Sequence, residues 1–73
     1  MGDEDIGCTG KSSWPELVGA LGTVAVTIIE SENPRVDAVI VPEGAAVILN
    51  FDCNRVWVWV NKAGKVIKIP IIG

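Results

Sequence analysis

Apolar and polar residues alternate strictly over the stretch from Arg55 to Val60. Valines take every second position, opposite an arginine and two tryptophans: Val56, Val58 and Val60 against Arg55, Trp57 and Trp59. A period of two is typical of a β-strand with one buried face. The preceding stretch, 44–52, is apolar but has no regular period and few turn residues. The pattern predicts a strand over 55–60, preceded by either an irregular connection or a displayed binding loop.

A second pattern, with steps of three and four, runs from Leu21 to Asn33. Its apolar members are Leu21, Val24, Ala25, Ile28 and Ile29. The β-branched or small residues from Val24 to Ile29 favour a strand by propensity, whereas the spacing of the apolar members favours an amphipathic helix. Because Asn33-Pro34 is a good helix stop, we expect a helix over 22–33. The segment Ser12–Glu16 carries a helix-start signal that Gly19 interrupts, which predicts a single turn.

Two further apolar runs complete the pattern. The valine-rich run 36–41 predicts a buried strand. The run 65–69 predicts a third strand, antiparallel to 55–60 and joined to it by a turn at 61–64. This order of elements indicates a small α+β fold, with one helix packed on a mixed parallel and antiparallel sheet. We expect residues 1–73 to form a single domain, in which 1–9 are mobile apart from Cys8.

The small size of the chain makes its two cysteines important. A chain of 73 residues buries only about 60% of its unfolded surface, so its stability is marginal without a covalent or metal staple. A bond between Cys8 and Cys53 would close a loop of about 45 residues, worth roughly 4 kcal/mol in the chain-entropy model. From the residues alone, two free buried thiols remain the alternative.

Charge and composition exclude several function classes. The net charge is −3 and the lysines form no cluster, which argues against nucleic-acid binding. No apolar run approaches the roughly 20 residues of a transmembrane helix, so we expect no membrane partner. The acidic start, MGDEDIG, is unlike a signal peptide, so the chain is either made without one or is a mature form.

The chain also lacks the residues that most enzymes need. It has no histidine, which excludes a Ser-His-Asp or Cys-His arrangement. Two cysteines cannot form a tetrahedral zinc site by themselves, and the glycines match no phosphate-binding loop. We therefore expect no metal and no cofactor, and a binding function rather than an enzyme.

Several segments together resemble the potato inhibitor I family of plant serine-protease inhibitors. They are Gly10–Gly19 (GKSSWPELVG), Ile28–Glu30, Glu32–Pro34, Ala38–Val41, Phe51, Cys53–Val56 and Ile72–Gly73. The resemblance covers about Cys8 to Gly73. It implies one helix on a small sheet, with a long exposed loop that joins two parallel strands. It also implies a disulfide between Cys8 and Cys53.

The resemblance further implies which residues act. The protease-binding loop would consist of Ala46, Val47, Ile48, Leu49, Asn50 and Phe51. Its scissile bond would be Leu49–Asn50, with Leu49 in the S1 pocket of the protease. Leucine suits chymotrypsin-like and subtilisin-like pockets, whereas a trypsin pocket holds an Asp that prefers Lys or Arg. Arg55 and Trp57 would support the loop.

Three positions depart from the family pattern. Ile48 stands where the family usually has Thr, Asn50 where it usually has an acid, and Trp57 where many members have a second arginine. These positions would otherwise form one network of charge-assisted hydrogen bonds. Either packing by Trp57 and Ile48 replaces that network and inhibition persists, or the loop is looser and the protein becomes a weak inhibitor or a slow substrate.

The resulting hypothesis is a monomeric inhibitor of chymotrypsin-like or subtilisin-like serine proteases, with a role in plant defence. The rival hypothesis is a non-inhibitory member that keeps the scaffold for storage or for binding another partner. A redox switch at Cys8 and Cys53 is a more distant alternative, because such pairs favour short spacing.

Overall fold

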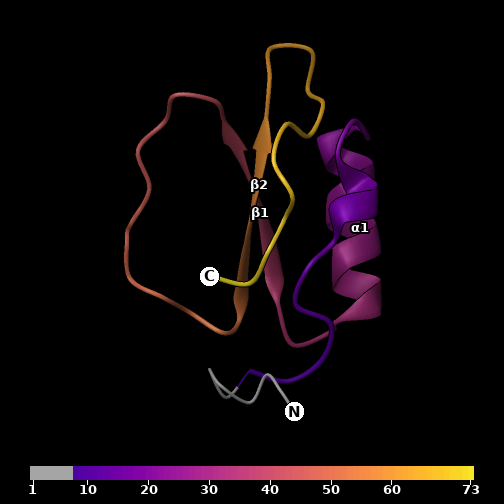
Figure 1. The fold of residues 1–73 in the computed structure, drawn as a ribbon, viewed down its shortest axis with the longest axis vertical. Helices are drawn as coiled ribbons and strands as arrows, with labels where there is room; N and C mark the ends of the chain where they lie inside the picture. The colour runs from indigo at the N-terminus through magenta and orange to yellow at the C-terminus, as the bar shows by residue number, and fades with distance from the viewer. Residues whose placement is uncertain (1–7) are drawn as a thin grey trace.

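The computed structural model describes residues 8–73. Most of the segment expected to be mobile, 1–9, therefore lies outside the described residues. Four elements follow in order: the 3₁₀ turn η2 (Pro15–Leu17), the helix α1 (Gly22–Glu32) and the strands β1 (Asp37–Pro42) and β2 (Arg55–Val60). In Figure 1, α1 covers one side of the strand pair, and the long connection between the strands arches away on the other side.

The helix predicted from the spacing of the apolar residues is confirmed as α1. The spacing therefore outweighs the β propensity of the side chains. It ends at Glu32, where Asn33 takes an extended conformation and its N–H still donates to the Ile29 carbonyl at 2.8 Å. The buried face is narrower than expected. Ala25 and Ile29 are buried, whereas Leu21 and Val24 remain about half exposed, because two strands cannot cover a wider stripe of the helix.

Strands β1 and β2 are parallel, with Asp37 beside Arg55 and Pro42 beside Val60. The alternation predicted for 55–60 is confirmed, since Val56, Val58 and Val60 are all buried. Parallel pairing requires a long connection, which residues 43–54 provide, because a tight turn can join only antiparallel strands.

The prediction that β1 is a buried strand is wrong. Val39 and Ile40 are 39% and 41% exposed, because β1 is an edge strand with a neighbour on one side only. The free edge is partly closed. The Ala38 N–H donates to the Glu30 carboxylate at 2.9 Å, and Pro42 has no N–H to offer.

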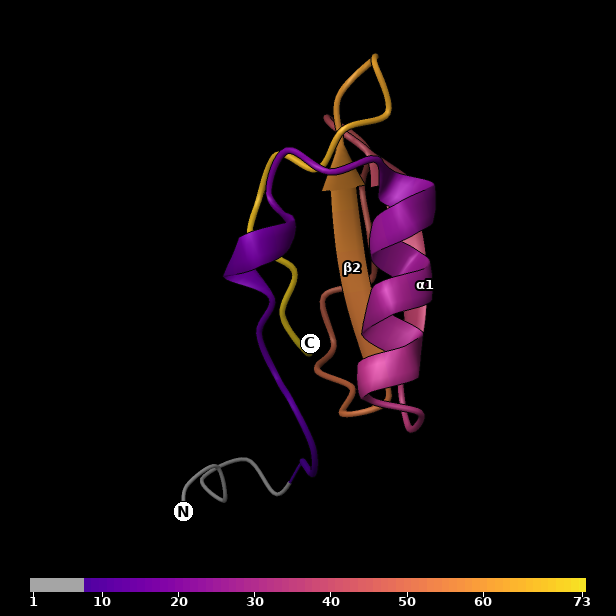
Figure 2. The same ribbon diagram turned by 90° about the vertical axis from the view of Figure 1, so that its right-hand side faces the viewer.

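The predicted third strand over 65–69 is also not formed. This stretch makes only isolated antiparallel bridges, at Lys65 and Val66. Its backbone divides its hydrogen bonds between two neighbours: the Val66 N–H donates to the Ala20 carbonyl at 2.8 Å, and the Ile67 N–H to the Trp59 carbonyl at 2.9 Å. A ladder with β2 alone therefore does not develop. Figure 2 shows this C-terminal segment running beside the N-terminal one, away from α1.

The core lies between α1, β2 and the two terminal segments. Its buried members are Trp14, Leu17, Ala25, Ile29, Val36, Val56, Val58, Val60, Val66 and Ile72. Gly22 permits close packing at the start of α1, since a Cβ there would lie 2.8 Å from the Val60 side chain. The core thus fixes β2 rigidly at the point where the connection from β1 ends.

Candidate functional site

The connection between β1 and β2 displays apolar side chains to solvent. Leu49 is 94% exposed, Ile48 68% and Phe51 54%. Full burial of such a side chain is worth roughly 1.5–3 kcal/mol, and the nearly fully exposed Leu49 forgoes most of it. These exposures place Leu49 and Ile48 outside the core. The connection is a displayed loop rather than a core segment.

The part of the loop before Asn50 makes few polar contacts. It leaves β1 through a turn in which the Ala45 N–H donates to the Pro42 carbonyl at 3.1 Å. No hydrogen bond within residues 8–73 involves the stretch from Ala46 to Leu49. Val47 is half-buried between exposed neighbours, so it is the inward-facing residue of this stretch.

Arg55 supports the loop from its downstream end, at the start of β2. Its guanidinium donates to the Asn50 carbonyl through Nη2, and Nη1 lies 3.5 Å from Asn50 Oδ1. Its Nε donates to the Gly73 carbonyl at 2.8 Å. The guanidinium carbon also lies 4.5 Å from the centre of the Trp57 ring. A cation over an indole face gains about 0.5–2 kcal/mol, so Trp57 helps to hold Arg55 in place.

Ile48 contributes no comparable support, because two-thirds of its surface faces solvent. The structure thus brings Asn50, Arg55 and Trp57 together. Ala46, Ile48, Leu49 and Phe51 are exposed beside this group and share no hydrogen bond with it.

A covalent bond anchors the downstream base of the loop. Cys8 and Cys53 form the disulfide that the family resemblance implied, with their Cα atoms 5.2 Å apart. The segment that carries Cys8 is itself fixed, because the buried Asn33 side chain donates to the Thr9 and Lys11 carbonyls at 3.1 and 3.0 Å. Gly10 lies so close to Asn33 that a Cβ would approach its amide nitrogen to 2.7 Å.

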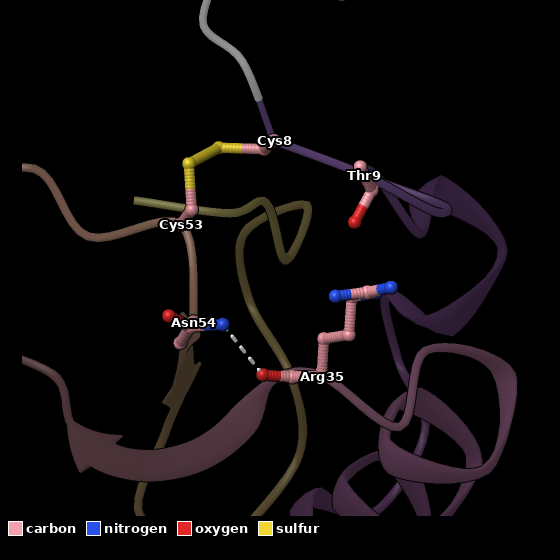
Figure 3. A pocket seen from close by; sticks show the side chains of 5 residues that line it. All are labelled: Cys8, Thr9, Arg35, Cys53 and Asn54. Carbon is pink, nitrogen blue, oxygen red and sulfur yellow. Dashed lines mark hydrogen bonds between the residues drawn. A yellow bond between two sulfur atoms is a disulfide. The ribbon is translucent and has the colours of Figure 1, made fainter.

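Below the disulfide lies an open polar pocket of about 250 Å³, lined by Cys8, Thr9, Arg35, Cys53 and Asn54 (Figure 3). The Asn54 side chain crosses it and donates to the Arg35 carbonyl at 2.9 Å.

Among residues 8–73 no cluster of His, Cys, Asp or Glu side chains is suited to a metal ion. In the same part of the chain no helix is long and apolar enough to cross a membrane.

Comparison with known proteins agrees with this architecture. The sequence model of the Potato inhibitor I family matches residues 5–73. The chain belongs to the Potato inhibitor I family. Its members are protease inhibitors, not enzymes.

Relatives of the family match the chain over nearly its whole length. One is the "Inhibitor of trypsin and hageman factor" from Cucurbita maxima, which is 59% identical over 66 residues, or 90% of this chain and 97% of the relative. Another, the "Trypsin/subtilisin inhibitor" from Amaranthus caudatus, is 46% identical over 63 residues, covering 86% and 91%. The crystal structure of the bitter gourd trypsin inhibitor superimposes with a TM-score of 0.89 at 53% identity, covering 90% and 97%.

Sequence reasoning missed two residues at the base of the loop, Asp52 and Asn54. Asn54 bonds to Arg35 and Asp37, and Asp52 Oδ1 accepts from the Asn54 N–H at 2.8 Å. An Asp two residues before an Asn between a loop and a strand is a local turn signal. The longer contact to Arg35 leaves no pattern in the sequence, since it joins residues 19 positions apart.

Proposed function

We propose that this member of the Potato inhibitor I family inhibits chymotrypsin-like or subtilisin-like serine proteases through its Leu49–Asn50 bond. The observation that carries the proposal is the pairing of a 94% exposed leucine with an anchored carbonyl one residue later. Leu49 is free to enter a pocket of the protease, while Arg55 holds the chain directly after it.

The mechanism follows from preorganisation. Residues 46–51 would lie in the substrate groove of the protease as an added strand, which supplies backbone hydrogen bonds independent of side-chain identity. Since Arg55 and the Cys8–Cys53 disulfide already restrain the downstream half, little conformational entropy remains to be lost on binding. If the bond is cut, the new amine of Asn50 stays beside the acyl-enzyme, and religation competes with release.

The side chain of Leu49 sets the class of target. It is apolar and uncharged, so it fits the large apolar S1 pockets of chymotrypsin-like and subtilisin-like proteases. In a trypsin pocket it would leave the Asp at the base without a cation, which is costly for a buried charge. We therefore expect weak inhibition of trypsin, although all three of the similar proteins described above bear names that mention trypsin inhibition.

Titration of chymotrypsin, subtilisin and trypsin activity with the purified protein tests the proposal. The expected result is stoichiometric loss of the first two activities with trypsin largely spared. Leu49→Ala should weaken that inhibition. Leu21→Ala is the matched control: Leu21 is also an exposed leucine, but it lies at the start of α1 and not in the loop, so its loss should not change inhibition. If no protease is inhibited and the chain is instead cut at Leu49–Asn50, the scaffold serves storage or another partner.

A further inference from the structure

The short segment between the loop and β2 is a closed turn. The Asn54 N–H donates to Asp52 Oδ1 at 2.8 Å, and the Arg55 N–H lies 3.3 Å from the Asp52 carbonyl. A side chain that accepts from the backbone two residues later is an Asx turn, which fixes the local path of the chain. The direction in which Arg55 leaves the turn is therefore set by residues 52–54.

Asn54 joins this turn to a separate part of the chain. Its side-chain amide donates to the Arg35 carbonyl at 2.9 Å, and its own carbonyl accepts from the Asp37 N–H at 2.8 Å. Figure 3 shows the first of these bonds crossing beneath the Cys8–Cys53 disulfide. The connection from α1 to β1 thus serves as the platform on which the base of the loop is fixed.

The position of Arg55 depends on that platform. Arg55 is the first residue of β2, and its guanidinium reaches back over five residues to Asn50. A small rotation of the turn would be magnified along the arginine side chain. Hydrogen bonds prefer angles above about 150° and weaken steeply below about 120°, so a rotation that misaligns the guanidinium weakens the contact.

We propose that Asn54 is a positioning residue for the reactive loop, which acts by fixing the turn that directs Arg55 to Asn50. This inference rests on the proposed function and extends it, because it names a support that is separate from the Arg55–Trp57 stack. Among the described residues, Asn54 itself shares no hydrogen bond with Leu49 or Asn50.

The test compares Asn54→Ala with Asn61→Ala. Asn61 is a matched control, because its side chain accepts from the Ala63 and Lys65 N–H groups at 3.0 and 3.1 Å and so stabilises a turn in another segment. Two readouts separate positioning from stability. The first is the inhibition constant for chymotrypsin together with the ratio of cut to intact chain at equilibrium. The second is the hydrogen exchange rate of the Arg55 Nη–H groups, which donate to Asn50, measured by NMR without protease.

We expect Asn54→Ala to weaken inhibition about tenfold, to shift the equilibrium toward the cut form and to speed Arg55 Nη–H exchange by a similar factor. Asn54→Asp should change both readouts in the same direction as Asn54→Ala, because it keeps the shape of the side chain and removes the N–H donor. Asn61→Ala should lower the melting temperature and leave both readouts at the wild-type value.

The inference is overturned if Asn54→Ala keeps the wild-type Arg55 exchange rate, or if Asn61→Ala changes both readouts equally. It is also overturned if Asn54→Asp matches the wild type, since the side-chain donor would then be irrelevant. Should the wild-type protein inhibit no protease while Asn54→Ala still speeds Arg55 exchange, the positioning role stands and the proposed function fails.

Discussion

The two sides of the Leu49–Asn50 bond differ in how the fold holds them. Upstream, Ala46 to Leu49 share no hydrogen bond with any described residue, and Leu49 is almost fully exposed. Downstream, Asn50 is held by Arg55, Cys53 by its disulfide and Asn54 by Arg35. The upstream side presents side chains to a partner, and the downstream side supplies rigidity. Recognition and support are thus assigned to different residues, which can be varied separately.

The largest effect should come from changing the recognition side alone. Leu49→Lys places a cation where the trypsin pocket holds an Asp, and we expect trypsin inhibition to tighten by about 4 kcal/mol, roughly a thousandfold. Inhibition of chymotrypsin should weaken, while the melting temperature stays unchanged, because Leu49 contacts little of the fold. Inhibition constants for both proteases check this. An unchanged trypsin constant would mean that Leu49 is not the residue that enters the pocket.

Removing the support should have the next largest effect. Arg55→Ala deletes the bonds to Asn50 and Gly73, and we expect inhibition to weaken by about 3 kcal/mol, roughly a hundredfold, with faster cleavage at Leu49–Asn50. Arg35→Ala is the matched control, since it removes the same charge while the backbone carbonyl that binds Asn54 remains. Equal losses in both variants would show that charge, rather than anchoring, matters.

A smaller effect should come from strengthening the upstream side of the Leu49–Asn50 bond. Ile48→Thr introduces a hydroxyl next to Leu49 at a position where the family usually has threonine, and one new hydrogen bond is worth about 1 kcal/mol. We expect roughly fivefold tighter inhibition of chymotrypsin. Ile71→Thr, at another exposed isoleucine, should leave inhibition as it is. If Ile48→Thr inhibits no better than the wild type, the absence of polar contacts upstream does not limit affinity.

The smallest effect should come from an ion pair outside the loop. The hydrogen bond from Lys11 Nζ to Glu16 Oε2 lowers the pKa of Glu16 and raises the pKa of Lys11. A lowered carboxyl pKa stabilises the fold above the ordinary value of 4.5, and this contribution is lost as pH falls through the lowered pKa. Melting temperatures between about pH 2 and 6 should therefore fall slightly less for Glu16→Gln than for the wild type. A difference in chymotrypsin inhibition between the two would contradict the separation of this pair from the loop.

Much of the fold could be predicted because its elements carry local periods. The steps of three and four around Ala25 and Ile29 gave the helix, and the alternation at Val56 and Val58 gave β2. The stretch 65–69 has strand-forming residues, but its hydrogen bonds go to two neighbours, Ala20 and Trp59, and sequence patterns do not reveal how a backbone divides its partners. The prediction that β1 is buried was wrong for a similar reason, since an apolar run does not show how many neighbouring elements will cover it.

The candidate site was predictable in its outline only. The disulfide and the loop residues came from the resemblance to the family, because no period marks residues 44–52. The exposure of Leu49 and the contacts of Arg55 depend on the folded position of β2. The role inferred for Asn54 depends on its bond to Arg35, which lies 19 positions away in the sequence.

The disulfide has a further consequence for a chain cut at Leu49–Asn50. Residues 8 to 53 form a covalent ring closed by Cys8 and Cys53, and the Leu49–Asn50 bond is part of that ring. Hydrolysis there would open the ring but would not divide the molecule. The product would gain one water and remain a single covalent species until the disulfide is reduced. With a protease present, intact and cut protein would therefore interconvert as two forms of one molecule, with no fragment lost by diffusion.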